Sequence, residues 1–477
     1  MPGFRLRYFP LLNSLAAFLA LIYWGLQSNW IQFKTECEHG KCMFHTGESF
    51  TSITTAIYYQ VFGAKFWYLQ LLSLSPGEHG WSADLYQPDW VDRHYMIYTH
   101  NPNIGGFLVY AAALLGFQTV IVPAIVTAVA YVVGIYLAFR FGEVVTGNRA
   151  IGYWYGFFMA TDFFYNLSYG LNLIRGWSWL GLFGAWYATA RLLKGGGPWS
   201  VALLVGGSLV TFLVGLDFDF LVTSSALMLV LFTGVAWRIR ARVALMIVVV
   251  SIAILGLRQI QIIGALGTDV WLTDIIYTAG LKIPYELRWY EIPDEAAITG
   301  WYDSHNLTRG YSAVFSIRVI VNWIFFWALL ETWHPLRYIA PVFPLGVASI
   351  VILLVMRREV DLVALRAFAA LTLGAALSGM VIFPHFTSYF IKLAFPHMTA
   401  IIFLGLAICV VSIWRLAALF NRPLALALMA VIVAVWSFQQ VASVRTAAPE
   451  VYPHLVRIVP YGFWFCSPPQ NPPIACS

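Results

Sequence analysis

Residues 243–264, VALMIVVVSIAILGLRQIQIIG, are the clearest indication of the fold class of this chain. This stretch is apolar almost throughout, and a helix of about 20 such residues crosses the ~30 Å hydrocarbon core of a bilayer. Arg238, Arg240 and Arg242 come just before it, and basic residues beside a span favour the cytoplasmic side. The stretch therefore predicts a transmembrane helix that begins in the cytoplasm.

Composition extends this reading to the whole chain. Of 477 residues, 60% are hydrophobic and 10% are charged, whereas soluble domains carry about 25% charged residues. The 20 Trp, 25 Tyr and 35 Phe suit interfacial belts and aromatic-lined cavities. The net charge of +6 comes from Lys and Arg in twos and threes between apolar runs, which is the positive-inside pattern. The composition thus predicts a polytopic membrane protein surrounded by lipids, and nucleic acid is not an expected partner.

Apolar runs of sufficient length occur about eleven times, because a span needs about 20 residues. The short basic start, Met1–Arg7, runs straight into the first of them, which indicates a retained helix rather than a cleaved signal peptide. The fifth and sixth runs are short enough to form a broken or re-entrant pair. The predicted spans are 9–27, 119–139, 150–168, 177–193, 200–216, 219–236, 243–264, 338–356, 363–383, 398–414 and 423–440.

Threading these spans places every basic cluster on one side, which the positive-inside rule makes the cytoplasm. The N-terminus then lies in the cytoplasm and the C-terminus in the periplasm. Loops 28–118 and 265–337 and the tail 441–477 fall outside, together with most acidic residues. We expect an all-α transmembrane domain, 1–440, that includes both large loops, followed by a periplasmic tail, 441–477.

Cysteine positions agree with this topology. Cys37 and Cys42 lie in the first outer loop, and Cys466 and Cys476 lie in the tail. An oxidising compartment would favour the disulfides Cys37–Cys42 and Cys466–Cys476. A structural zinc site is the competing interpretation, although no CxxC spacing is present. Cys409 falls within a span and is expected to be a small apolar residue.

The two large loops contain apolar segments of their own. Residues 49–75, 103–118 and 313–330 follow polar or Pro/Gly breaks and have helical spacing. They are expected to be helices that lie in the outer interface, with additional spans as the alternative. Such loops favour a site at the outer membrane surface that accepts a lipid-linked substrate.

Two loop motifs supply candidate site residues. Glu48, in Gly47-Glu48-Ser49, precedes a helical run; one interpretation is a capping role and the other a general base for an acceptor hydroxyl. His100, in His100-Asn101-Pro102, precedes the second interfacial segment and either caps a helix or contacts a phosphate.

Ionisable residues at the outer ends of spans form a third group. Asp217 and Asp219 fall where the fifth span meets the outside, and ionisable groups at membrane depth are costly and suggest function. The basic and polar members of the group would neutralise a lipid phosphate together, although each cation alone could simply snorkel to the interface. They are Arg258, Arg337, His385, Tyr389 and Lys392.

The order of these motifs resembles the GT-C fold glycosyltransferases, in particular the branch of protein O-mannosyltransferases and lipid A aminoarabinose transferases. Gly47-Glu48-Ser49 stands where that family has an acidic motif, and His100-Asn101-Pro102 where it has a His or Lys before proline. Two later stretches are also similar. These are Trp333-His334-Pro335-Leu336-Arg337-Tyr338, and Ser388-Tyr389-Phe390 through Pro396-His397.

The resemblance implies a bacterial inner-membrane enzyme that moves a sugar from a polyprenyl-phosphate-linked donor to a periplasmic acceptor: a glycan, lipid or protein. Glu48, Asp217 or Asp219 would act as the base, with Glu36 and Glu38 as further alternatives, because the family's acidic pair is reduced here. Arg258, Arg337, His385 and Lys392 would stabilise the departing phosphate. Some members use a divalent cation, Mg or Mn, for which Asp217 and Asp219 are the candidate ligands.

Two other functional classes remain open at this point. A transporter or flippase for a lipid-linked substrate would show mid-span charges, broken helices and inverted repeats. A non-catalytic assembly subunit would keep the spans but would have no reason to gather acids and phosphate-binding bases at one outer cavity. The few mid-span charges and the absence of a visible repeat favour the enzyme.

Overall fold

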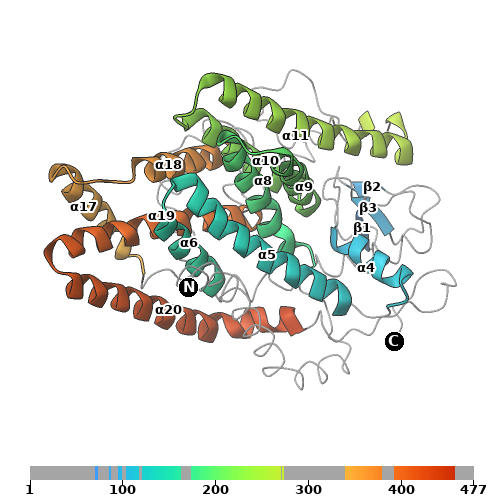
Figure 1. The fold of residues 1–477 in the computed structure, drawn as a ribbon. Helices are drawn as coiled ribbons and strands as arrows, with labels where there is room; N and C mark the ends of the chain where they lie inside the picture. Colours follow the sequence, from blue (N-terminus) through green and yellow to red (C-terminus); the bar gives the residue numbers. More distant parts are fainter. Residues whose placement is uncertain are drawn as a thin grey trace, which may run out of the picture.

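The computed structural model describes residues 70–73, 85–86, 95–98, 104–117, 121–162, 173–269, 271–272, 275, 339–378 and 391–456. A helical bundle dominates these residues, with a small sheet beside it (Figure 1). The strands are β1 (Gln70–Ser73), β2 (Leu85–Tyr86) and β3 (Tyr95–Tyr98). The first helices are α4 (Ile104–Leu114), α5 (Ile121–Thr146), α6 (Arg149–Thr161), the 3₁₀ turn η2 (Arg175–Trp177), α8 (Ser178–Leu193) and α9 (Pro198–Val214). The remaining helices are α10 (Leu216–Phe232), α11 (Trp237–Leu266), α17 (Val342–Val355), α18 (Leu362–Leu377), α19 (Ile391–Phe420) and α20 (Arg422–Val456).

Each predicted span from 119–139 onward coincides with one of these helices, whereas the span at 9–27 lies outside the described residues. Within the described residues, four helical segments are long and apolar enough to cross a membrane: Ile125–Thr146, Trp237–Gly264, His397–Phe420 and Arg422–Gln440. Shorter apolar helices include Pro198–Val214 and Val342–Val355. These helices support a membrane protein, and the total of about eleven spans remains a prediction.

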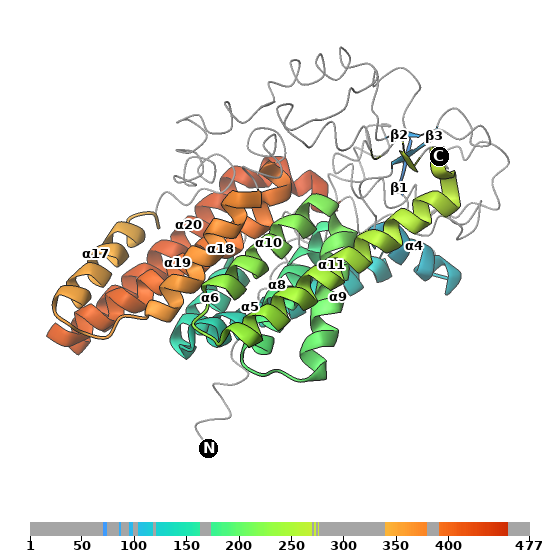
Figure 2. The same cartoon turned by 90° about the horizontal axis from the view of Figure 1, so that it is seen from above.

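The bundle has an aromatic core around α8. Trp179, Phe183 and Trp186 of α8 are all buried, and the Phe183 ring meets Phe141 of α5 and Tyr155 of α6. In contrast, α11 and α20 lie at the periphery, where Ile252 of α11 and Val431 of α20 are exposed (Figure 2). Lipid tails would cover these outer faces, because a bilayer solvates apolar side chains.

Small residues set the distance between helices at several crossings. A Cβ added to Gly207 of α9 would lie 2.4 Å from the backbone nitrogen of Ala185 in α8. At the α10–α18 crossing, a Cβ on Gly374 would lie 2.4 Å from the Cα of Ser225. Close backbone approach of this kind is the usual way in which membrane helices associate, since lipid is as apolar as a side chain.

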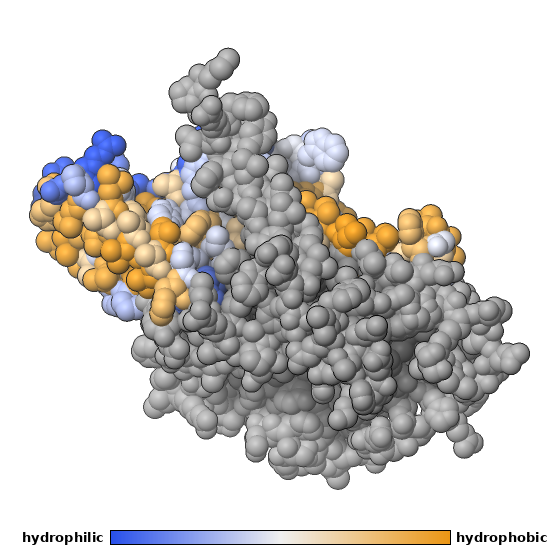
Figure 3. All heavy atoms as spheres, turned by 90° about the horizontal axis from the view of Figure 1, so that it is seen from below, coloured by the Kyte–Doolittle hydropathy of each residue, from blue (hydrophilic) through white to orange (hydrophobic). Residues whose placement is uncertain are grey.

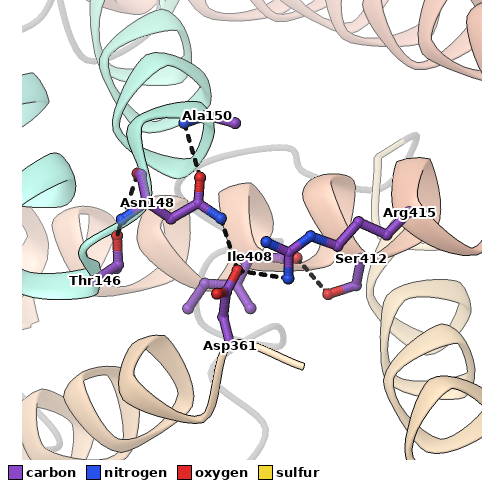
Figure 4. A network of polar contacts seen from close by, with 7 residues as sticks. All are labelled: Thr146, Asn148, Ala150, Asp361, Ile408, Ser412 and Arg415. Atoms are coloured by element: carbon purple, nitrogen blue, oxygen red, sulfur yellow. Dashed lines mark hydrogen bonds and ion pairs between the residues drawn. The ribbon is translucent and has the colours of Figure 1, made fainter. Parts of the chain in front are cut away.

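The α5–α6 and α17–α18 connections, which are far apart in the sequence, meet helix α19 at one end of the bundle (Figure 4). The Asp361 carboxylate, just before α18, accepts a hydrogen bond from Asn148 Nδ2 at 2.7 Å and pairs with Arg415 of α19 at 3.0 Å. Lys194, after α8, donates to the carbonyl oxygen of Val144 near the end of α5. These are turns that the threading places on one side. We call this side of the molecule, with the α10–α11 and α19–α20 turns, the basic end (Figure 2).

The first outer loop contains strands, which the all-α prediction did not include. The sheet is antiparallel in the order β1-β3-β2, with Gln70 opposite Tyr98 and Leu85 also opposite Tyr98. Residues 70–73 were predicted to continue a helix over 49–75, and they form β1 instead. A segment as short as four residues fits a helix and a strand equally well, and only pairing with a distant segment decides between them.

Two further predictions, the helix within 103–118 and the start of the tail at 441, can be compared with the structure. The helix predicted within 103–118 is present as α4, which begins directly after Pro102-Asn103. The tail was predicted to begin at residue 441. Helix α20 instead continues through this position to Val456.

Candidate functional site

The buried charged side chains, with several buried polar ones, lie toward the end of the bundle opposite the basic end, whereas Thr146 and Ser200 are buried near the basic end. The side chains toward the opposite end come from the start of α5, the end of α6, η2, the α9–α10 junction, the far part of α11, the end of α18 and the start of α19. Burying such groups in a membrane protein is costly unless they are paired or used. The set consists of Thr127, Asp162, Arg175, Ser178, Thr211, Asp219, Arg258, Ser378 and His397.

The α9–α10 junction is held by a carboxylate. Gly215 alone separates the two helices, and the hydroxyl of Thr211 donates to Asp219 Oδ1 at 2.5 Å across it. Asp219 is 3% exposed. Its carboxylate therefore fastens the last turn of α9 to the first turn of α10, and in this arrangement it faces protein rather than an open surface.

Asp217, the other acid of this motif, lies in the first turn of α10, where the helix dipole favours a negative charge. The two acids occupy positions i and i+2 of one helix, and such positions do not share a face. The Asp219 carboxylate accepts a hydrogen bond from Thr211, and a cation held by Asp217 and Asp219 together stays a prediction. Within the described residues, no group of three or more His, Cys, Asp or Glu side chains is placed to hold a metal.

Arg258 faces the bundle rather than the lipid. Ile254, one turn earlier on α11, packs beside Phe212 of α9 and Phe220 of α10, which flank the junction. Residues four apart share a helix face, so Arg258 lies on the same side, about one turn of ~5 Å further from the basic end. Only 4% of Arg258 is exposed. Burial to this degree contradicts the snorkelling alternative for this residue, because a snorkelling side chain reaches water along the surface.

Two buried ionisable residues were missed by the sequence reading. Asp162 caps the C-terminal end of α6 with 1% of its surface exposed, and Arg175 in η2 is 6% exposed. The neighbours of both residues are tied to other helices. Thr161 accepts a hydrogen bond from Trp436 Nε1 at 2.8 Å, and Thr127 accepts one from Trp177 Nε1 at 3.0 Å. Asp162 could have been found in the sequence, because it is a lone acid within the predicted span 150–168, and such an acid is a functional candidate by default.

Unsatisfied polar atoms lie next to these residues in the chain. The hydroxyl of Ser178, three residues after Arg175, is buried, and so are both amide atoms of Gln261, three residues after Arg258. None of these atoms has a hydrogen-bond partner in the part of the chain that the structure describes. Buried polar atoms are usually satisfied, so these are groups that a bound water or ligand would complete.

A second polar cluster links α10, α18 and α19. His397 of α19 is fully buried, and its Nε2 lies 2.8 Å from the hydroxyl of Ser225. Beside it, the hydroxyls of Ser224 and Ser378 lie 2.5 Å apart, and Ser224 donates to the carbonyl oxygen of Gly374 at 3.0 Å. The His397 ring packs edge-on against Trp186 of the aromatic core. This cluster joins three helices, and its contacts are with protein groups.

Several predicted site residues lie outside the described residues: Glu48, His100, Arg337, His385 and Tyr389. The same is true of Cys37, Cys42, Cys466 and Cys476, and of the interfacial segment 313–330. Lys392 lies in the first turn of α19, and like Asp217 it is described by its backbone alone. Cys409, by contrast, is a free buried thiol packed against Gly346 of α17, as expected for a small apolar residue.

Comparison with protein-family models and with curated protein sequences finds no match. Among solved structures, the chain is similar to the oligosaccharyltransferase of Archaeoglobus fulgidus in its apo form. The two chains share 14% identity with a TM-score of 0.40, and the match covers 94% of this chain. It spans 55% of the archaeal chain, so this chain corresponds to little more than half the length of that enzyme.

Proposed function

We propose that the chain is a membrane glycosyltransferase of the GT-C type, which transfers a sugar from a polyprenyl-phosphate-linked donor to an acceptor at the outer membrane surface. One observation carries the proposal: buried charged residues from α6, η2, α10 and α11 gather toward a single end of an apolar bundle. That end lies opposite the basic end, so it faces the periplasm of the bacterial inner membrane if the basic end is cytoplasmic. The order of the loop motifs adds support from the sequence.

In the proposed reaction a carboxylate removes the proton from the acceptor hydroxyl as that oxygen attacks the anomeric carbon. The bond between this carbon and the phosphate oxygen breaks, and the polyprenyl phosphate leaves with the electron pair. Glu48 is the first candidate for the base and Asp217 the second. Asp219 then acts as a positioning residue, because its carboxylate already accepts a hydrogen bond from Thr211.

The departing phosphate requires positive charge and hydrogen-bond donors in a site from which water is excluded. Arg258 is buried on the bundle side of α11 and is the described residue best suited to this role. Gln261 and Ser178 offer polar atoms that have no partner within the described residues. We assign Arg337, His385, Lys392, His100 and Tyr389 to the same donor site on the basis of the motif order.

The direct test incubates the purified protein with a panel of labelled polyprenyl-phosphate sugars and a membrane extract as the acceptor source. We expect transfer from at least one donor, and we expect its loss in Glu48→Gln and in Arg258→Gln. Glu359→Gln is the matched control, since Glu359 is an exposed carboxylate at the basic end. Normal transfer by both Glu48→Gln and Asp217→Asn would refute the assignment of the base.

A transporter for the same lipid-linked substrate is the second candidate, and the short α9–α10 pair favours it. Each helix has 17 residues, or about 25 Å at ~1.5 Å per residue, and discontinuous helices often line transport sites. The two functions separate in one experiment with proteoliposomes. Transfer of label to a new glycosidic bond indicates the enzyme, whereas movement of intact donor between leaflets without transfer indicates the transporter.

A further inference from the structure

The basic end carries many positive charges at its surface that form no ion pair with a carboxylate within the described residues. Exposed Lys and Arg side chains come from the α5–α6, α8–α9, α10–α11, α17–α18 and α19–α20 turns. They are Arg149, Arg191, Lys194, Arg238, Arg242, Arg357, Arg358 and Arg422. Contacts described above hold several of these turns together, so the charges belong to one end of a single body.

Acidic residues do not balance these charges. Glu143 pairs with Arg140 at 3.2 Å, and Asp361 pairs with Arg415 at 3.0 Å, so both carboxylates are engaged by half-buried arginines. Glu359 is the exposed acid among the described residues of these turns. The exposed basic side chains therefore give this end a strong positive potential, which attracts anions.

Aromatic side chains stand in the same turns. Trp199 is 88% exposed at the start of α9, and Trp237 is 64% exposed at the start of α11. The guanidinium of Arg240 lies 5.6 Å from the centre of the Trp237 ring. Tryptophan at a helix end settles at the headgroup level of a bilayer, so these residues mark the depth at which the neighbouring cations lie.

We infer that the basic end binds anionic phospholipid headgroups and selects them over zwitterionic ones. Figure 3 shows hydrophilic residues at the upper left that lie directly beside hydrophobic ones. A soluble anionic partner would not need exposed tryptophans beside its site, whereas a lipid fills both the charged and the apolar part. Arg191 and Lys194 beside Trp199, and Arg238 and Arg242 beside Trp237, form the two strongest binding segments.

The test measures lipid association with the full-length protein reconstituted in phosphatidylcholine vesicles. Electron paramagnetic resonance of spin-labelled phosphatidylglycerol and phosphatidylcholine gives the relative association of each lipid. We expect a several-fold preference for phosphatidylglycerol, which falls as salt is raised because ions screen the attraction. Equal association of the two lipids with the wild-type protein would overturn the inference.

Matched variants separate charge from folding. The combined change Arg191→Gln, Arg238→Gln and Arg242→Gln is expected to abolish the preference. Arg191→Lys with Arg238→Lys and Arg242→Lys keeps the charge and should keep the preference. If the glutamine variant retains the wild-type preference, the headgroups are bound elsewhere and the assignment of these residues is wrong. Neither result depends on transfer activity.

Discussion

Asp361 and Asn148 are 213 positions apart in the sequence, yet the Asn148 amide donates to the Asp361 carboxylate at 2.7 Å. The same carboxylate pairs with Arg415 at 3.0 Å, so one side chain joins the α5–α6 and α17–α18 connections to helix α19. Both ionic partners are only half-buried, and solvent screening limits what each contact contributes.

Removing this carboxylate is expected to loosen the basic end. Asp361→Ala should lower the free energy of unfolding by about 1 kcal/mol, the sum of a screened ion pair and one hydrogen bond. Thermal unfolding in detergent, followed by a tryptophan signal, measures the change. Glu359→Ala removes an exposed neighbouring carboxylate and should have no measurable effect. An equal loss of stability in both variants would show that the contacts of Asp361 with Asn148 and Arg415 do not stabilise this end.

The α9–α10 junction makes a second prediction. Thr211→Val removes the donor to Asp219 and leaves a buried carboxylate oxygen without it, which should cost about 1–3 kcal/mol of stability. Asp219→Asn keeps the oxygen that accepts from Thr211, so its stability loss should be smaller. If Asp219 only positions the helices, the asparagine variant also keeps transfer activity. Loss of transfer by a stable Asp219→Asn protein would instead make Asp219 the base.

Close helix packing can be tested at Gly374. Gly374→Ala places a methyl group 2.4 Å from the Cα of Ser225, and the strain should destabilise the bundle by about 1–3 kcal/mol. Gly256 of α11 is the control, since an added Cβ meets nothing within 4 Å there. Gly256→Ala should be neutral or stabilising, because alanine favours a helix by about 1 kcal/mol over glycine. Opposite signs in the two melting curves are the expected result.

We expect the contact between the buried residues Ser225 and His397 to stabilise the fold. Ser225→Ala leaves His397 Nε2 without its hydroxyl partner, with an expected loss of about 1–3 kcal/mol. Ser412→Ala is matched in chemistry, but its hydroxyl bonds only the carbonyl oxygen of Ile408 in its own helix. The control should change stability by less. Similar melting temperatures for both variants would show that the contact with His397 contributes little.

A substitution at Gln261 tests ligand binding without a loss of stability. The Gln261 amide atoms have no partner within the described residues, so Gln261→Leu should leave stability unchanged or raise it, as replacing an unsatisfied polar group usually does. If the amide contacts the donor, KM should rise about tenfold, the equivalent of ~1.4 kcal/mol. Gln259→Leu is the contrast, since Gln259 accepts from Trp271 Nε1 at 2.7 Å and its loss should reduce stability. An unchanged KM in a stable Gln261→Leu protein removes this residue from the site.

The positions of the apolar helices, and the grouping of their basic ends, could be predicted from the amino-acid sequence alone. Apolar length and flanking arginines are local properties, which is why 243–264 and nine other predicted spans coincide with helices from α5 to α20. The same local reasoning found Asp219 and Arg258, because a charge inside an apolar run is conspicuous wherever the run packs.

The neighbours of those charges could not be predicted, because they depend on how the helices pack. The tertiary structure paired Asp219 with Thr211, turned Arg258 toward the bundle, buried Asp162 and Arg175, and joined Asp361 to Asn148 and Arg415. It also made a strand of Gln70–Ser73, where the sequence indicated a helix. These outcomes depend on contacts between segments far apart in the chain. The energy of such contacts cannot be predicted from any single segment.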